Sequence, residues 1–150
     1  MKSQLSVEID CPIEEVFERT GDVTHWSLVC VENEILDEKP VGVGTKFRMI
    51  TEDRGHRMEF QGVCTAHETP RLHSAHLEGK QFDIDVTYTF EDLDGRTRVT
   101  QDSKVSPKGF MKVIFVLLGW AFRKSNCKAQ QKELESLKRY CETGEKVREN

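Results

Sequence analysis

Four residues near the middle of the chain carry side chains of the types that bind metal ions. They follow the spacing C-x2-H-x5-H-x2-H and comprise Cys64, His67, His73 and His76. Thiolate and imidazole groups are the usual protein ligands of zinc. The surrounding residues alternate as in β-strands, however, and residues three positions apart on a strand point to opposite faces. We therefore expect no metal site, and we place these histidines on the surface or at the rim of a pocket.

Two other patterns imitate functional sites. Asp83 and Asp85 share a strand face, as the paired carboxylates of a glycosidase would, but they alternate with apolar residues and so belong to the solvent side. Gly42 and Gly44 suggest a phosphate-binding loop, but they join two predicted strands rather than a strand and a helix. No Ser-His-Asp or Cys-His set is identifiable from local spacing. The catalytic residues, if there are any, therefore stay unassigned.

Uncharged polar residues on the inner faces of the predicted strands are better candidates for a binding site. Four of these polar residues share a strand face with apolar residues, namely Thr51, Tyr88, Gln101 and Ser103. His76 joins them if the even-numbered residues of its strand face inward. Such groups inside an apolar cavity orient a ligand by hydrogen bonds. The alternative is that they bond to backbone or water at the ends of the sheet.

These side chains require a sheet to position them. Alternation of apolar and polar residues predicts a first strand through Leu5, Val7 and Ile9. Two short helices follow, one over residues 13–20 with Asp10 as a candidate N-cap, and one ending at Trp26 with Asp22 as its cap. Six further strands are expected at 29–35, 45–52, 58–66, 71–77, 82–91 and 97–105. The inward parity of the strand at 71–77 stays open.

A long helix is predicted at the end of the chain. Residues 107–141 lack an internal proline and are rich in helix-forming residues, with Ser106 as candidate N-cap and Gly144 as the stop. Residues 110–122 are apolar on nearly every side, yet too few to cross a bilayer core of about 30 Å. One stripe, through Val113, Leu117 and Trp120, continues toward Leu134, so we expect it to face the sheet along the whole helix.

A second apolar set on this helix lies off that stripe. Phe115 and Phe122 have no counterpart further along and stand near Arg123 and Lys124. Unless the two short helices cover them, they form an exposed patch rimmed by cations, which suits a membrane-surface contact or a homodimer.

Composition fits one globular domain. Of the 150 residues, 37% are hydrophobic and 32% are charged, so we expect a single domain at 1–144 and a polar tail at 145–150. Five scattered cysteines favour reduced thiols, and no signal-peptide pattern opens the chain, so we expect a cytoplasmic protein. A net charge of −4 without a basic stripe disfavours nucleic-acid binding.

The order of elements resembles a known superfamily. Six consecutive antiparallel strands have one apolar face, and only the long helix is large enough to cover it. This α+β arrangement resembles the START-like or SRPBCC superfamily of helix-grip proteins. The resemblance rests on residues 10–17 (DCPIEEVF), Trp26, residues 40–44 (PVGVG), residues 68–72 (ETPRL) and the turn at 92–95 (DLDG). That superfamily includes polyketide cyclase/dehydrase-like, pollen-allergen-like and lipid-transfer proteins.

The resemblance implies a cavity between the sheet and the long helix. Its expected walls are Phe47, Met49, Thr51, Met58, Phe60, Phe82, Ile84, Val86, Tyr88, Phe90, Gln101, Ser103, Val113, Leu117 and Trp120. We expect it to bind or transport an apolar or aromatic small molecule, such as a lipid, an isoprenoid or a polyketide-like compound, without a cofactor. One alternative is a cyclase or dehydratase, which needs a titratable inward side chain, and the clear strands offer no inward Asp, Glu or Lys. The other alternative is an interaction module that docks through the apolar front of the helix.

Overall fold

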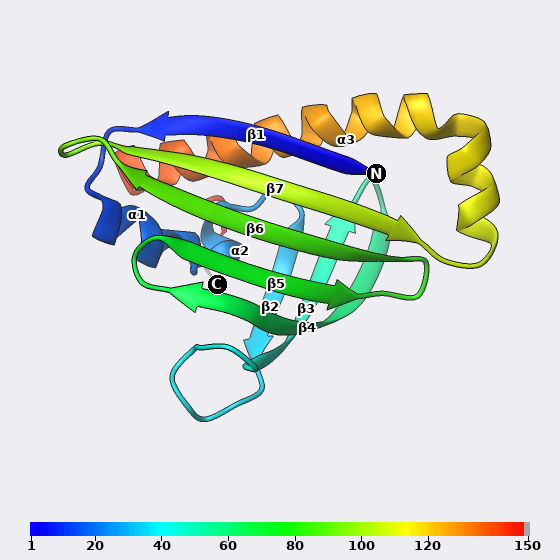
Figure 1. Ribbon diagram of the computed structural model, residues 1–150, viewed down its shortest axis with the longest axis horizontal. Helices are drawn as coiled ribbons and strands as arrows, with labels where there is room; N and C mark the ends of the chain where they lie inside the picture. Colours follow the sequence, from blue (N-terminus) through cyan, green and yellow to red (C-terminus); the bar gives the residue numbers. More distant parts are fainter. Residues whose placement is uncertain (149–150) are drawn as a thin grey trace.

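Seven antiparallel strands form one curved sheet in the computed structural model, which describes residues 1–148 (Figure 1). Their order across the sheet is β1-β7-β6-β5-β4-β3-β2. The strands are β1 (Lys2–Ile9), β2 (Cys30–Ile35), β3 (Lys46–Asp53), β4 (His56–Glu68), β5 (Leu72–Glu78), β6 (Phe82–Asp92) and β7 (Thr97–Pro107). Helices α1 (Ile13–Thr20) and α2 (Val23–Trp26) lead from β1 at one edge to β2 at the other, and α3 (Phe110–Thr143) runs alongside β1. The predicted helix-grip fold is confirmed.

The inner face of the sheet follows the predicted alternation where the ladders are regular. Val99 pairs with Val7 on one side and Phe90 on the other, and both Val99 and Phe90 are buried. The next residue, Thr100, faces the opposite side, where its hydroxyl meets that of Ser6 at 2.8 Å. This two-residue period places the apolar side chains of β1, β6 and β7 under the helices.

A β-bulge in β4 interrupts the alternation. Cys64 pairs with Ala75, but the next pair along the ladder is Ala66 with Ser74, so Thr65 is an extra residue. A bulge reverses the facing of every residue beyond it. Cys64 and His67 therefore share the inner face, and the expectation that they point to opposite sides is wrong.

The facing of β5 is also settled. Ala75 and Leu77 are buried, so His73 shares their inner face. His76 lies on the outer face, where its Nδ1 is 2.7 Å from a carboxylate oxygen of Asp85. His76 is therefore not one of the inward polar groups, because the residues of β5 that face inward are His73, Ala75 and Leu77.

Two apolar clusters lie on the inner face. The first surrounds Trp26 and includes Leu134, Leu137 and Tyr140 from the carboxyl-terminal part of α3. The second comprises Phe47, Phe60, Ala75 and Leu77, with Met49, Met58, Phe82, Ile84 and Val86 packed against it. No residue of α3 belongs to the second cluster, so the helix covers only one end of the sheet.

Helix α3 has a kink at Leu118, where φ is −122° and ψ is 18°. Glycine is a common site of helix kinks, and Gly119 is the next residue. We call residues 110–117 the front segment and residues 119–143 the back segment. Figure 1 shows the front segment, in yellow, turning away from the line of the back segment. The expected straight helix is therefore wrong.

The kink reverses the predicted roles of the apolar residues. Val113, Leu117 and Trp120 were expected to face the sheet, but they are 51%, 69% and 76% exposed. Phe115 and Phe122 were expected to form an exposed patch unless the short helices covered them; their rings stack on each other at 5.0 Å between centroids and are half-buried. A stripe that is continuous on a straight helix is broken when the helix bends at its middle.

The ends of the helices also differ from expectation. Pro107 ends β7, and α3 begins at Phe110 after Gly109, so Ser106 is not its N-cap. Neither Asp10 nor Asp22 caps a helix through its side chain; α1 begins after Pro12. Gly144 does end α3, in the left-handed conformation at φ 77° that glycine adopts readily.

The segment after Gly144 packs against α2. The backbone N–H of Val147 donates to the carbonyl of His25 at 2.8 Å. The Arg148 guanidinium donates to the carbonyls of Thr24, Ser27 and Cys30, among others. Residues 149 and 150 of the predicted tail lie outside the described part. Among residues 1–148, no helix is long and apolar enough to cross a membrane.

Candidate functional site

A cavity of about 820 Å³ lies between the inner face of the sheet, α2 and the back segment of α3. Side chains from β2 to β7 form most of its wall, and residues 125–133 of α3 close one side. Ten of the predicted cavity residues line it, namely Phe47, Met49, Thr51, Phe60, Ile84, Val86, Tyr88, Phe90, Gln101 and Ser103. The two short helices add Phe17 and Trp26.

Five predicted residues lie elsewhere. Met58 and Phe82 pack against the second apolar cluster but do not line the cavity. Val113 and Leu117 are outside it because the front segment bends away at Leu118, and Trp120, two residues past the kink, is also exposed.

Polar groups on the wall that sequence reasoning missed come mainly from α3. Gln130 is buried although it is polar, and Glu133 follows one turn later. A sequence signal existed for Gln130, because it lies on the stripe of Cys127, Leu134 and Leu137, at steps of three, four and three residues. Glu133 carries no such signal, since it lies beside the stripe among charged neighbours.

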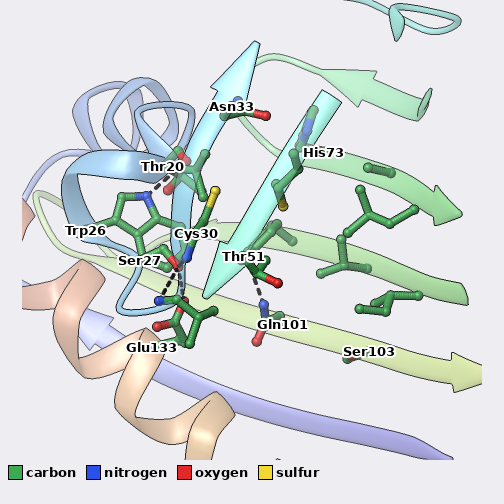
Figure 2. A pocket seen from close by; sticks show the side chains of 18 of the residues that line it. Thr20, Trp26, Ser27, Cys30, Asn33, Thr51, His73, Gln101, Ser103 and Glu133 are labelled. Atoms are coloured by element: carbon green, nitrogen blue, oxygen red, sulfur yellow. Dashed lines mark hydrogen bonds between the residues drawn. The ribbon is translucent and has the colours of Figure 1, made fainter. Parts of the chain in front are cut away.

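Glu133 is held at the junction of α2 and β2. One carboxylate oxygen accepts a hydrogen bond of 2.5 Å from the Ser27 hydroxyl, and the other accepts one of 2.5 Å from the backbone N–H of Leu28 (Figure 2). Burial raises the pKa of the Glu133 carboxyl, and these hydrogen bonds and Arg148 oppose the rise. The cavity thus has a carboxyl group with a raised pKa on its wall, supplied by α3 rather than by the strands to which the expectation of no inward Asp, Glu or Lys applied.

A second polar group connects the sheet to α3. The Gln101 side chain donates to the Tyr88 hydroxyl at 2.8 Å, and Gln130 donates to the backbone carbonyl of Gln101 at 2.9 Å. Burial raises the pKa of Tyr88, which therefore stays protonated at neutral pH. The side-chain oxygens of Asn33, Gln101 and Gln130 are buried and accept no hydrogen bond from the described residues. Buried acceptors are normally paired, so these three oxygens are exceptions among the polar atoms of the cavity residues.

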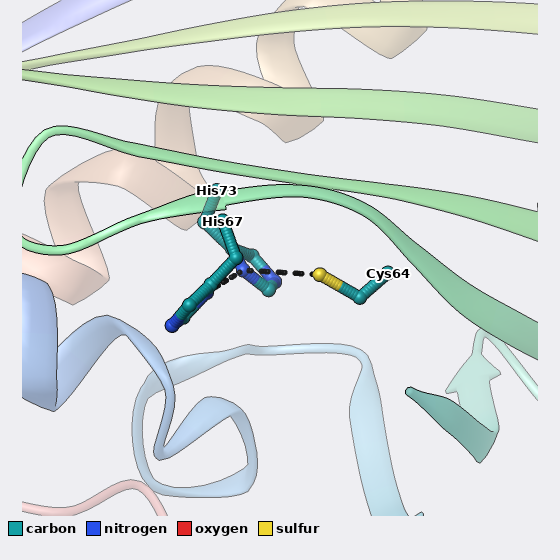
Figure 3. A group of neighbouring side chains, drawn as sticks. All are labelled: Cys64, His67 and His73. Carbon is teal, nitrogen blue, oxygen red and sulfur yellow. Dashed lines mark hydrogen bonds between the residues drawn. The ribbon is translucent and has the colours of Figure 1, made fainter. Parts of the chain in front are cut away.

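The bulge in β4 creates a third group of polar side chains. Nδ1 of His67 and Nδ1 of His73 are 3.1 Å apart, and Sγ of Cys64 is 4.0 Å from Nδ1 of His73 (Figure 3). The ring of Phe17 contacts His67 at 5.4 Å between centroids. Burial lowers the pKa of His73, and the neighbouring His67 lowers it further, so His73 is neutral at pH 7.

The cysteines of the wall are not poised as nucleophiles. Burial raises the pKa of Cys30 to about 11 and also raises that of Cys64. Neither thiol is a thiolate at neutral pH unless a bound cation displaces its proton. All five cysteines of the chain are free.

Comparison with known proteins gives one family and one fold. The sequence model of the family described as "Polyketide cyclase / dehydrase and lipid transport" matches residues 1–142. TTHA0849 from Thermus thermophilus has a similar structure, with a TM-score of 0.78 at 16% identity over 94% of this chain and 97% of that one. The Zhui aromatase/cyclase from Streptomyces sp. R1128 gives 0.69 at 14% identity over 96% and 97% of the two chains. Ara h 8.0201 gives 0.67 at 13% identity over 94% and 97%. A search of curated proteins found no match to the sequence.

Proposed function

Because the chain belongs to the polyketide cyclase/dehydrase and lipid transport family, we propose that its cavity binds an apolar or aromatic small molecule of the lipid, isoprenoid or polyketide-like kind. The observation that carries this proposal is the cavity itself. Its volume of about 820 Å³ is in the range of small-molecule sites, and phenylalanine, methionine and aliphatic side chains form much of its wall.

The polar groups of the wall narrow the ligand class. Asn33, Gln101 and Gln130 line the cavity, and each carries a buried oxygen with no hydrogen-bond partner among the described residues, so an apolar ligand that carries hydroxyl groups suits them once a side-chain rotation turns these oxygens toward it. The cations on the wall belong to Arg54, Lys128 and Lys132, which are all exposed and therefore lie at its rim. A hydroxylated aromatic compound should therefore bind better than a phosphorylated one.

Two adjacent residues of β6 provide a matched test of binding. Val86 lines the cavity, whereas Thr87 faces the other side, where its hydroxyl accepts a hydrogen bond from Ser74 at 2.8 Å. We expect Val86→Trp to fill the cavity and weaken binding of a fluorescent hydroxylated aromatic probe by more than about tenfold, and Thr87→Trp to leave it unchanged. Equal affinities in both variants, or binding confined to nucleotides and sugar phosphates, would contradict the proposal.

A cyclase or dehydratase is the second candidate, and Glu133 is the observation that favours it. A carboxyl group of raised pKa on a cavity wall can exchange a proton with a bound carbonyl compound. A linear poly-β-ketone offered to the enzyme would then close a ring and lose one water, which mass spectrometry detects. Glu133→Gln should bind the compound and not convert it. If the wild-type protein binds it without conversion, the protein is a binding protein only.

We also propose that the protein binds the surface of an anionic membrane, from which it would take up an apolar ligand or into which it would release one. The exposed front patch comprises Phe110, Val113, Val116, Leu117, Leu118 and Trp120. Residues 107–132 contain six Lys or Arg and no Asp or Glu, so the patch stands in a cationic region. Apolar side chains rimmed by cations match the chemistry of an anionic bilayer surface.

Vesicle sedimentation tests this contact. The double variant Val116→Ser, Trp120→Ser should lose most binding to vesicles that contain phosphatidylserine, and neutral vesicles should bind the wild type weakly. Leu36→Ser, at a residue 49% exposed in the loop after β2, is the control and should not alter binding. Self-association of the wild type that the double variant abolishes, without vesicle binding, would replace the membrane with a second copy of the chain.

A further inference from the structure

The bulge at Thr65 brings together three residues that the regular strand pattern separates. Cys64 and His67 come to one face on β4, and His73 lies directly across from His67 on β5. Each offers one ligand atom, and these three atoms all lie within 4.8 Å of one another. The paired strands β4 and β5 hold all three, and the bulge between Cys64 and Ala66 sets their spacing.

Two of the three distances between ligand atoms are close to those of a tetrahedral zinc site, and the third is at most 4.8 Å. Zinc binds imidazole nitrogen at about 2.0–2.1 Å and thiolate sulfur at about 2.3 Å, so ligand atoms on a tetrahedron are about 3.3–3.6 Å apart. The two histidine nitrogens are 3.1 Å apart, and Sγ of Cys64 is 4.0 Å from Nδ1 of His73. Side-chain movements of a few tenths of an ångström would bring both separations to the ideal values.

We propose that Cys64, His67 and His73 bind one Zn²⁺ ion on the cavity wall. Three protein ligands of this type, with a fourth position left open, characterise zinc sites that act on other molecules rather than purely structural ones. Among residues 1–148, no fourth Cys, His, Asp or Glu joins the cluster. All three ligands line the cavity, so the fourth position takes water or an oxygen atom of a bound ligand.

The surroundings of the histidines support metal binding through Nδ1. Nε2 of His67 is 3.5 Å from the hydroxyl of Thr69, within reach of the kind of hydrogen bond that orients a metal-binding imidazole. The packing of Phe17 against the ring of His67 restricts its rotation. The competing explanation is a simple hydrogen bond between the two imidazoles, with the buried Cys64 thiol donating to the backbone carbonyl of Ala66 at 3.4 Å, and it needs no cation.

Cobalt(II) distinguishes these explanations because it replaces zinc and is coloured. We expect the reduced, metal-free wild-type protein to bind one Co²⁺ per chain. The spectrum should show a thiolate-to-cobalt charge-transfer band and the visible bands of tetrahedral cobalt, and one equivalent of Zn²⁺ should abolish both. Zn²⁺ should also raise the melting temperature. This binding does not depend on an apolar ligand, so it can fail while the proposed function stands.

Two variants and two controls locate the site. Loss of a group that only orients a metal ligand weakens metal binding about 10–100-fold. Cys64→Ser and His73→Asn each remove a metal ligand itself, so each should weaken metal binding by at least about 100-fold. Cys64→Ser should also remove the charge-transfer band. Cys30→Ser, at another buried cavity cysteine, and His76→Asn, on the outer face, should bind as the wild type does. The proposal is overturned if the wild type binds no stoichiometric Co²⁺ or Zn²⁺, or if binding is unchanged in Cys64→Ser or His73→Asn. The wild-type titration decides even if a variant fails to fold.

Discussion

The kink in α3 can be tested by one substitution made at two places. Leu137 is fully buried in the first apolar cluster, and Leu117 is 69% exposed on the front segment. We predict that Leu137→Ala lowers the free energy of unfolding by about 3 kcal/mol, within the 2–5 kcal/mol typical of buried leucines. That loss corresponds to a fall in melting temperature of about 6–12 °C for a chain of this length.

Leu117→Ala should lower the free energy of unfolding far less than Leu137→Ala does. About a third of this side chain is buried, which limits the lost transfer free energy to less than about 1 kcal/mol. Both substitutions replace leucine by alanine within a helix, so the small change in helix propensity is the same in each and cancels in the comparison.

Urea denaturation followed by circular dichroism, at low protein concentration, measures both variants. A straight helix whose apolar stripe faced the sheet would bury Leu117 as well as Leu137. If Leu117→Ala costs more than about 2 kcal/mol, the front segment packs on the sheet and our account of the kink is wrong. Repeating the measurement at a tenfold higher concentration would show whether self-association buries the front patch.

Two further predictions concern the sheet and the carboxyl group of the cavity. Val99→Asp places a charge in the first cluster and should lower the free energy of unfolding by more than about 3 kcal/mol. Thr100→Asp, on the outer face, should lower it by less than about 1 kcal/mol. Similar melting temperatures for the two variants would show that Val99 and Thr100 do not face opposite sides of the sheet. The pKa of Glu133 is raised on folding, so its contribution to stability is present below its ordinary pKa of 4.5 and is lost as pH rises through the raised value. The stability advantage of the wild type over Glu133→Gln should therefore shrink as pH rises above about 4.5, and a constant difference in urea denaturation would contradict this.

The sheet could be predicted from the sequence because its signal is local. Alternation over β6 and β7 is regular, and the structure keeps it residue by residue: Phe90 pairs with Val99, and Tyr88 with Gln101. The order of elements then leaves α3 as the only cover for the inner face. Fold class therefore follows from patterns that span a few residues, together with one argument about burial.

The bulge and the kink could not be predicted in the same way. Thr65 is an extra residue only in relation to β5, because the pairing of Cys64 with Ala75 and Ala66 with Ser74 defines it. The sequence of β4 alone does not show the bulge, because the bulge is defined by how β4 pairs with β5. The polar character of Gln130 obscured its inward position, although its spacing to Leu134 was a usable signal.

The cavity and the exposed front patch are two apolar surfaces that the fold leaves uncovered. The back segment places Leu134 and Leu137 against one end of the sheet, and the second apolar cluster receives no side chain from α3. The front segment leaves the line of the back segment at Leu118, and most of its apolar side chains are exposed. Apolar surface on both the sheet and the front segment is therefore without an intramolecular partner among the described residues. The sheet can recover that burial from a ligand and the front segment from a bilayer, so the two proposals account for surface that folding alone leaves uncovered.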